Sequence, residues 1–208
     1  MLNKVLIAIA MVAVPTVSIA ADMPYIVEAP ATFDDRWSGS FIGVQAGYSN
    51  LTAKEAGVLD KTVSGPTIGL FGGHNFVFDN VLIGAELSAE LTDDKTSLTT
   101  RTSGETNWSA GAALRLGYVM GAYVPYLKAG IGLTEMEATF IPTGQKDTAV
   151  HTNLDFGGGF ETMVADDVSL RVEGIYRITS KENYTINGAT GGVEADGFIG
   201  RIGLAYHF

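Results

Sequence analysis

The segment Val81–Leu91, VLIGAELSAEL, decides the fold class of this chain. Its odd-numbered positions are Val, Ile, Ala, Leu, Ala and Leu, whereas its even-numbered positions are Leu, Gly, Glu, Ser and Glu. Successive side chains of a β-strand point to opposite faces, so a period of two separates an apolar face from a small or polar one. The segment therefore predicts a strand with two chemically different faces.

Seven further segments alternate in the same way, and each has the roughly 9–11 residues that a strand needs to span a bilayer. Together the eight predicted strands cover about 38–49, 66–77, 81–91, 107–118, 123–134, 152–164, 168–179 and 197–208. The connections alternate between short turns (78–80, 119–122 and 165–167) and long polar stretches (50–65, 92–106, 135–151 and 180–196). This alternation is typical of outer-membrane barrels, whose periplasmic turns are short and whose extracellular loops are long. We therefore predict an all-β fold, an eight-stranded antiparallel up-and-down transmembrane β-barrel with both termini periplasmic.

The two faces of the predicted strands differ in charge. The apolar face carries no Asp, Glu, Lys or Arg, and its titratable exception is His74. The other face carries five acids and five bases, which we predict to form a charge network in the lumen: Glu86, Glu90, Arg115, Lys128, Asp155, Glu161, Arg171, Glu173, Arg177 and Arg201. A Lys or Arg facing lipid at the bilayer midplane costs roughly 2–4 kcal/mol, so the uncharged face suits lipid. The alternative, a soluble barrel with the apolar face inside, would turn a glycine-rich face toward water.

Aromatic residues of the apolar face gather near the strand ends. Tyr48, Trp108, Tyr176 and Phe198 are expected at one rim, and Phe76, Tyr118, Tyr206 and Phe208 at the other. Such aromatic girdles mark the two interfaces of a membrane barrel. A soluble barrel offers no reason for this placement.

The first 20 residues have the pattern of a cleavable signal peptide. Lys4 is followed by the apolar run 5–14, Pro15, and a small-x-small site that ends at Ala20. The alternative, a membrane anchor, is disfavoured because the run is short of the ~20 residues of a spanning helix. We predict cleavage after Ala20, a flexible periplasmic leader at 21–36, and the outer-membrane barrel domain at 37–208 in a Gram-negative cell.

Charge and composition exclude several functions. Without Lys4 the chain retains 12 Lys and Arg against 23 Asp and Glu, a net charge of −11 instead of −10. An acidic protein of this kind is not expected to bind nucleic acid. With no Cys in the chain, thiolate metal sites and Cys nucleophiles are excluded. We predict no cofactor and no metal.

Several motifs carry a family likeness. The segment Trp37–Tyr48, WSGSFIGVQAGY, resembles the opening strand of small outer-membrane barrels of the OmpA-like, opacity-porin type, and most resembles the alphaproteobacterial outer-membrane immunogenic protein group. The likeness continues through Arg115–Tyr118, Val124–Tyr126 and Ser169–Glu173, and ends in Arg201–Phe208. The resemblance implies an abundant surface antigen. It also implies that Leu204, Tyr206 and Phe208 form the signal read by the barrel-assembly machinery.

These observations favour a structural and surface protein with a side-chain-filled lumen. An eight-stranded barrel is just wide enough to be filled by its own side chains, so the polar loops would carry contacts in adhesion or immune recognition. The expected partners are outer-membrane lipid and lipopolysaccharide, the assembly machinery, and host or surface ligands of the loops.

Three alternatives remain open. The lumen charges could line a narrow porin-like channel for small solutes. A lipid-modifying enzyme would have to use His74, His151 or His207, but His74 is expected at the lipid face, His207 at the periplasmic mouth and His151 at a loop-to-strand junction. We therefore expect no enzyme. Haem or metal capture by His151, Met136 and Tyr184 lacks any ligand spacing such as H-x-x-x-H.

Overall fold

The structure, a computed structural model, describes residues 35–55, 59–93, 96–99, 102–140, 142, 144–186 and 189–208. The predicted signal peptide and the leader up to residue 34 lie outside the described residues. The last leader residues, Asp35 and Arg36, form a short 3-10 turn with Trp37, η1 (Asp35–Trp37), directly before the first strand. In the described part of the chain, no helix has the length and apolar character needed to cross a membrane.

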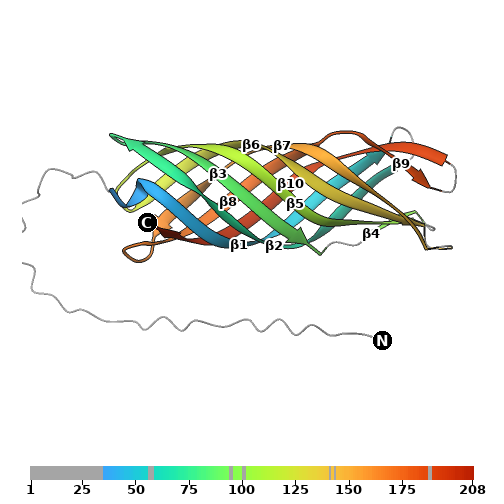
Figure 1. Ribbon diagram of the computed structural model, residues 1–208, viewed down its shortest axis with the longest axis horizontal. Coiled ribbons are helices and arrows are strands. Elements are labelled where there is room, and N and C mark those ends of the chain that lie inside the picture. Colours follow the sequence, from blue (N-terminus) through green and yellow to red (C-terminus); the bar gives the residue numbers. More distant parts are fainter. Residues whose placement is uncertain are drawn as a thin grey trace, which may run out of the picture. The chain divides into compact units, whose positions relative to one another are not determined.

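Ten strand segments build a closed wall (Figure 1). They are β1 (Gly39–Glu55), β2 (Leu59–Phe78), β3 (Val81–Thr92), β4 (Thr96–Thr99), β5 (Thr102–Tyr118), β6 (Tyr123–Phe140), β7 (Gln145–Met163), β8 (Val168–Thr179), β9 (Glu182–Ile186) and β10 (Ala189–His207). The wall order is β1-β2-β3-β5-β6-β7-β8-β10, and β10 closes it by pairing with β1. The short segments β4 and β9 pair with β5 and β10. All pairs are antiparallel, which confirms the predicted eight-stranded barrel.

Six of the eight wall strands are longer than the sequence predicted, whereas β3 and β8 match the prediction within one residue. The expectation of four long loops was wrong. The β1–β2 ladder continues to Glu55↔Leu59 and the β6–β7 ladder to Phe140↔Gln145. Most of the four polar stretches is therefore paired strand. Period two fails as a signal there because neither face of a strand outside the bilayer has to be apolar. Pairing with the neighbouring strand nevertheless satisfies the hydrogen-bonding groups of the backbone. Thr and Val, which occur in these stretches, also favour an extended chain.

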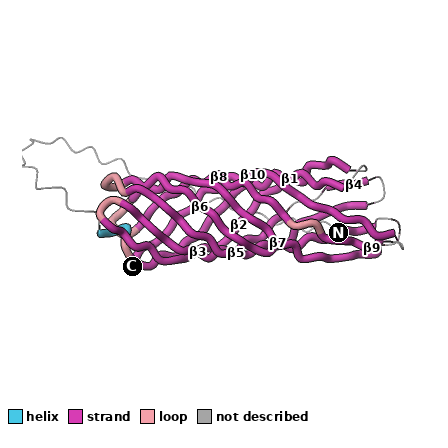
Figure 2. Tube along the Cα trace, turned by 90° about the horizontal axis from the view of Figure 1, so that it is seen from above, coloured by secondary structure: helices cyan, strands magenta, loops and turns pink. Residues whose placement is uncertain are grey.

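Backbone pairing divides the long-hairpin end of the barrel into two groups of strands. The β2–β3 ladder ends at Thr67↔Thr92, and the β7–β8 ladder ends at Asn153↔Thr179. Beyond these points the pairs β9–β10–β1–β2 and β4–β5–β6–β7 continue. We call these two groups the arms. Figure 2 shows the short turns at the end where the carboxyl terminus lies, and the hairpins at the other end.

The apolar face of the wall points outward. Large apolar side chains such as Leu114, Leu127 and Ile68 are exposed by 68%, 68% and 64%. A water-soluble protein rarely shows so large an apolar surface, whereas lipid requires it. Trp108 is only half-buried at the rim, beside a register shift between Thr106 and Trp108.

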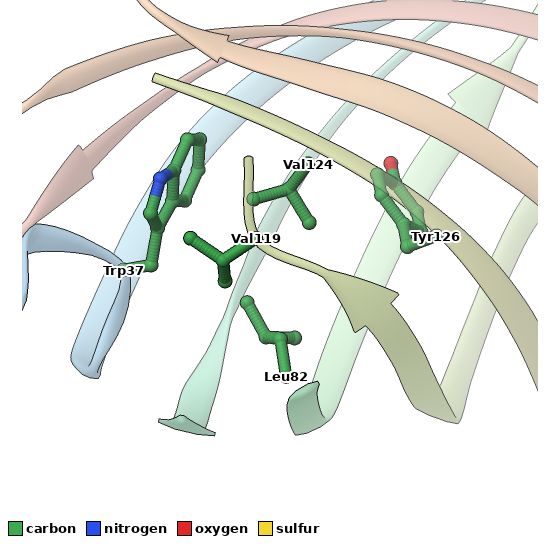
Figure 3. Close-up of a cluster of buried hydrophobic side chains, with 5 residues drawn as sticks. All are labelled: Trp37, Leu82, Val119, Val124 and Tyr126. Carbon is green, nitrogen blue, oxygen red and sulfur yellow. The ribbon is translucent and has the colours of Figure 1, made fainter. Parts of the chain in front are cut away.

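The lumen also contains large apolar side chains, which the sequence pattern did not identify. They form three clusters: Trp37, Leu82, Val119, Val124 and Tyr126; Phe41, Phe71 and Ala205; and Leu51, Ile175, Ala195 and Ile199. Figure 3 shows the first cluster, where the Trp37 indole lies beside Val119 and Val124. The indole N–H donates to the carbonyl oxygen of Gly121 in the β5–β6 turn at 2.9 Å. Trp37 thus ties the turn before β1 to the opposite side of the barrel mouth.

A glycine permits close packing inside the wall. A Cβ on Gly43 would lie 2.3 Å from the Phe71 ring and 2.4 Å from the carbonyl oxygen of Leu204. Both distances are far below van der Waals contact. The absence of a side chain at Gly43 therefore lets the ring of Phe71, its register partner on β2, pack directly against the backbone of β1.

Candidate functional site

The centre of the lumen is organised around the carboxylate of Glu86 on β3. It accepts hydrogen bonds from Lys128 Nζ at 2.5 Å and from Arg171 Nη1 at 2.7 Å. Arg115 Nη1 lies 3.7 Å from the same carboxylate. One acid thereby joins β3, β5, β6 and β8, because the alternation of each strand turns its charged residue inward.

A second acid, Glu173 on β8, extends this centre. Its Oε1 accepts hydrogen bonds from the Tyr126 hydroxyl at 2.7 Å and from Lys128 Nζ at 3.2 Å. Its Oε2 lies 3.6 Å from Arg171 Nη2 and 3.9 Å from Arg201 Nη1. Lys128 and Arg171 thus each lie between the two acids Glu86 and Glu173.

The alternation favours Glu86 or Glu90 as the partner of Arg115, and the structure has Glu86 as one of its two acidic partners. Arg115 Nη2 donates to Glu161 Oε2 at 2.5 Å, whereas Glu86 is the more distant contact. Glu90 instead accepts from Arg201 Nη2 at 2.5 Å and from Gln45 Nε2 at 3.0 Å. The sequence did not identify Glu161 because the partner of a lumenal side chain across a barrel depends on strand tilt and stagger, which alternation alone does not reveal.

Neutral side chains connect and cover the charges. Gln45 Oε1 accepts from Arg171 Nη2 at 2.6 Å, so Gln45 joins Arg171 to Glu90. The Arg171 guanidinium lies 3.3 Å from the centroid of the Phe71 ring, and that of Arg115 lies 4.2 Å from the Tyr126 ring. Sequence reasoning missed these neutral residues, although their position on the charged face was a usable signal.

A separate polar layer lies toward the long-hairpin end. Arg177 contacts Asp155 through two hydrogen bonds, Nε–Oδ1 at 2.9 Å and Nη2–Oδ2 at 2.7 Å. Asn153 Nδ2 donates to the same carboxylate at 2.9 Å, and Thr134 Oγ1 donates to Asn153 Oδ1 at 3.1 Å. Such two-pronged Arg–carboxylate contacts fix orientation as well as charge.

Toward the short-turn end, Glu161 connects the charges to a Ser–His pair. Ser169 Oγ donates to Glu161 Oε1 at 2.6 Å and lies 3.0 Å from His207 Nε2. The His207 ring meets the Trp37 ring edge-on, with 5.5 Å between the ring centroids. The series of polar contacts from Arg115 through Glu161 and Ser169 to His207 thereby ends at the apolar cluster that contains Trp37.

The lumen charges are therefore almost completely removed from water. Nine of the ten predicted residues are buried, and Asp155 is half-buried. Each of the ten has an opposite charge within 4 Å. A buried charge without a partner costs several kcal/mol, so mutual pairing is what makes this interior tolerable.

The structure does not bring the three histidines together. His151 is fully buried in β7, not at the loop-to-strand junction expected from the sequence, because β7 begins already at Gln145. Its Nδ1 lies 2.8 Å from the carbonyl oxygen of Ser180. His74 is exposed on the outer face, as its parity indicated.

Of the proposed haem or metal ligands, the structure describes the side chains of His151 and Met136. Met136 packs against the buried cluster of Leu51 and Ile175. The side chain of Tyr184 lies outside the described residues. Within the described part of the chain, no three His, Asp or Glu side chains are placed to hold a metal ion.

The carboxyl-terminal residues and the predicted girdles lie on the outer face. Phe208 is 73% exposed, and its ring meets that of Tyr206 edge-on at 5.1 Å. Its backbone N–H donates to the carbonyl oxygen of Ser40 on β1 at 2.9 Å. The outer-face girdle residues other than Trp108 are all exposed: Tyr48, Phe76, Tyr118, Tyr176, Phe198, Tyr206 and Phe208, as is Leu204 of the predicted assembly signal.

The arms carry charges outside the apolar band. Glu137 of β6 accepts a hydrogen bond from Lys146 Nζ of β7 at 2.5 Å, and this bond raises the pKa of Lys146. Asn107 Nδ2 donates to Glu135 Oε1 at 3.1 Å nearby. Because Lys146 is 59% exposed, this pair is screened by solvent and contributes little to stability.

Comparisons with known proteins agree with this architecture. Residues 6–208 match the model of the outer membrane protein beta-barrel domain. The 25 kDa outer-membrane immunogenic protein of Brucella canis is 29% identical over 175 residues, which are 83% of this chain and 79% of the relative. The 31 kDa outer-membrane immunogenic protein of Brucella melitensis is 26% identical, over 71% of this chain and 73% of the relative.

A solved structure has the same fold. Neisserial surface protein A superposes with a TM-score of 0.56 and 15% identity, and the match covers 82% of this chain and 98% of that protein. The predicted resemblance to small outer-membrane barrels and to the immunogenic protein group is thus confirmed, and these relatives imply an outer-membrane localisation. The chain belongs to the outer membrane protein beta-barrel domain family.

Proposed function

We propose that this protein is a structural and surface component of the outer membrane, with a lumen that does not conduct and arms that contact the cell's surroundings. The observation that carries the proposal is the filled lumen, in which paired charges alternate with buried apolar clusters. An eight-stranded barrel has an interior just wide enough for its own side chains to fill. The exposed surface outside the lipid band then belongs to the arms.

The same architecture supports a proposed orientation. Short turns are typical of the periplasmic side and long hairpins of the extracellular side, so we place both termini in the periplasm and the arms outside the cell. Outer-membrane lipid and lipopolysaccharide would surround the apolar band. The barrel-assembly machinery would read Leu204, Tyr206 and Phe208 before β10 pairs with β1. The signal peptide would be cleaved after Ala20.

The surface role is supported by the relatives. Those of Brucella are named immunogenic, a property that requires exposure to an immune system. In this chain the arms are the extracellular surface available for such recognition, or for adhesion to a host ligand. Their polar and acidic side chains, such as Glu135, Glu137 and Glu194, suit contact with water or with a basic partner.

The buried Ser169–His207 pair does not support an enzyme. Ser169 is fully buried and His207 is 5% exposed, so a lipid or peptide substrate has no access to the serine oxygen. The acid of this group, Glu161, is also bound to Arg115. Hydrolysis by a serine nucleophile requires a reachable hydroxyl and a base free to accept its proton. The geometry instead suits a structural link between the lumen charges and the mouth.

Epitope labelling on intact cells tests the surface role. The tag is inserted after Gly144 in the β6–β7 turn of one arm, and in a matched variant after Gly121 in the β5–β6 short turn. Both glycines lie in turns with positive φ, so neither insertion interrupts a strand. The proposal predicts labelling of the Gly144 variant on intact cells, and of the Gly121 variant only after the outer membrane is permeabilised. The reverse pattern would contradict the proposed orientation.

A further inference from the structure

A polar pair lies on the lipid-facing side of the barrel. Ser40 of β1 and His74 of β2 are direct partners in the β1–β2 ladder, and both side chains are exposed. The distance between Ser40 Oγ and His74 Nδ1 is 3.0 Å. The two side chains therefore form a hydrogen-bonded unit on a face that is otherwise largely apolar or small.

The imidazole ring of His74 has one nitrogen left for a further partner. Ser40 accounts for Nδ1, and no hydrogen bond within the described residues reaches Nε2. An imidazole that faces lipid without a partner for its second nitrogen is unfavourable. Polar and ionisable side chains at the lipid face are accordingly rare and mark sites of function.

The surroundings of the pair define its depth in the membrane. The rings of His74 and Phe76 lie 4.6 Å apart. Tyr206 of β10 and Phe208, which follows β10, form a second aromatic pair, and the backbone N–H of Phe208 donates to the carbonyl oxygen of Ser40. Aromatic side chains of this kind lie at the level of the lipid head groups. The pair is thus within reach of polar lipid atoms rather than at the hydrocarbon midplane.

Two small residues lie on the outer face next to the pair. The cross-strand neighbour of His74 on β3 is Ala85, and the preceding outward position on β2 is Gly72. The register partners of Gly72 are the exposed Ile42 of β1 and Leu87 of β3, so an acyl chain over Gly72 and Ala85 would be flanked by these two apolar side chains. The imidazole and hydroxyl lie directly below such a chain, on the side of the short turns.

We propose that Ser40 and His74 bind the phosphate-bearing head group of a phospholipid in the periplasmic leaflet. His74 Nε2 donates to a phosphate oxygen, and the Ser40 hydroxyl holds the ring through Nδ1. The acyl chains lie over Gly72 and Ala85. The assignment to the periplasmic leaflet rests on the proposed function, since it requires the short turns to face the periplasm.

Lipid retention by the refolded barrel tests the site. The barrel in octyl glucoside is titrated with phosphatidylglycerol, and retained lipid is counted by native mass spectrometry for the wild type, His74→Leu and Ser40→Ala. The matched control is Asn50→Leu, which removes an exposed polar side chain of β1 at the opposite rim. We expect His74→Leu to lower retention several-fold, Ser40→Ala to lower it less, and Asn50→Leu to leave it unchanged.

A second arm separates lipid from free phosphate. In barrel labelled with ¹⁵N-histidine, phosphatidylglycerol should shift the Nε2 resonance of His74, and inorganic phosphate in the same detergent should not. Equal retention in the wild type and His74→Leu would overturn the site, and an equal shift by inorganic phosphate would overturn its assignment to a lipid. Neither result touches the proposed surface role, which is read independently by the epitope variants. Retention of a heat-modifiable gel band by each variant shows that the barrel has folded.

Discussion

Leu114 and Arg115 are consecutive residues of β5 that lie in opposite environments. Leu114 is 68% exposed on the outer face, whereas Arg115 is 1% exposed in the lumen with Nη2 2.5 Å from Glu161 Oε2. Two adjacent residues of one strand therefore face lipid and a buried ion pair, respectively. The two positions should respond to substitution in opposite ways, which provides a sharp test of the assigned faces.

Leu114→Arg should impair membrane insertion. The new charge faces the bilayer near its midplane, where it costs roughly 2–4 kcal/mol. The measurement is the folded yield in vesicles, read from the heat-modifiable band. Leu114→Ile is the matched control and should fold at the wild-type yield. Normal insertion of Leu114→Arg would mean that this face does not contact lipid.

Arg115→Leu should insert but lose stability, because it leaves the fully buried Glu161 without its main cation. Breaking one side of a buried pair typically costs about 3–5 kcal/mol. The urea midpoint of the refolded protein measures the loss. The double variant Arg115→Leu/Glu161→Gln should recover part of it, whereas Arg115→Leu/Glu90→Gln should recover none. Recovery with Glu90→Gln instead would contradict the observed pairing.

Surface protease on intact cells should cut within 180–196 or 92–106. These polar stretches belong to the arms, where the segments β4 and β9 are short and each pairs with a single neighbour. Short and singly paired segments open locally more easily than the wall of the barrel. The fragments can be mapped by mass spectrometry. Cleavage confined to the short turns 78–80 and 165–167 would reverse the topology.

Deletion of Phe208 should slow assembly in cells far more than it destabilises the folded barrel. The Phe208 side chain is 73% exposed at the outer face, so its removal forfeits at most about 1.5–3 kcal/mol of burial. Its proposed recognition takes place earlier, while β10 is still unpaired. Cellular yield is compared with the urea midpoint of protein refolded in detergent. An unaltered cellular yield would leave Phe208 as a girdle residue only.

Much of the wall could be read from the sequence, since lipid imposes a strict period of two. The alternation in Val81–Leu91 placed Glu86 and Glu90 inside, and the structure has them there. The partners of these acids could not be read, because contacts across the lumen depend on strand tilt. Arg115 and Glu161 are 46 positions apart in the chain, and only the closed barrel brings them together.

The arms and the mouth were missed for a different physical reason. Outside the bilayer both faces of a strand can be polar. The alternation of apolar and polar residues therefore did not predict the pairing of Glu55 with Leu59. Trp37 precedes the first alternating residue, and its burial depends on a hydrogen bond to Gly121 in a distant turn. The periodicity of a sequence indicates which face of a strand contacts lipid, but it does not indicate which residues a turn contacts.

Single-channel recording of the refolded protein in a planar bilayer tests the filled lumen most directly. Wild-type protein should give no resolvable conductance steps, because three groups of side chains block the lumen at successive depths. They are the apolar cluster around Trp37, the charges bound to Glu86, and the Arg177–Asp155 pair. Arg171→Ala, which removes a guanidinium between Glu86 and Glu173, serves as the matched comparison recorded under the same conditions. Uniform conductance steps from the wild-type barrel, present at the same size in Arg171→Ala, would contradict a lumen closed by its own side chains.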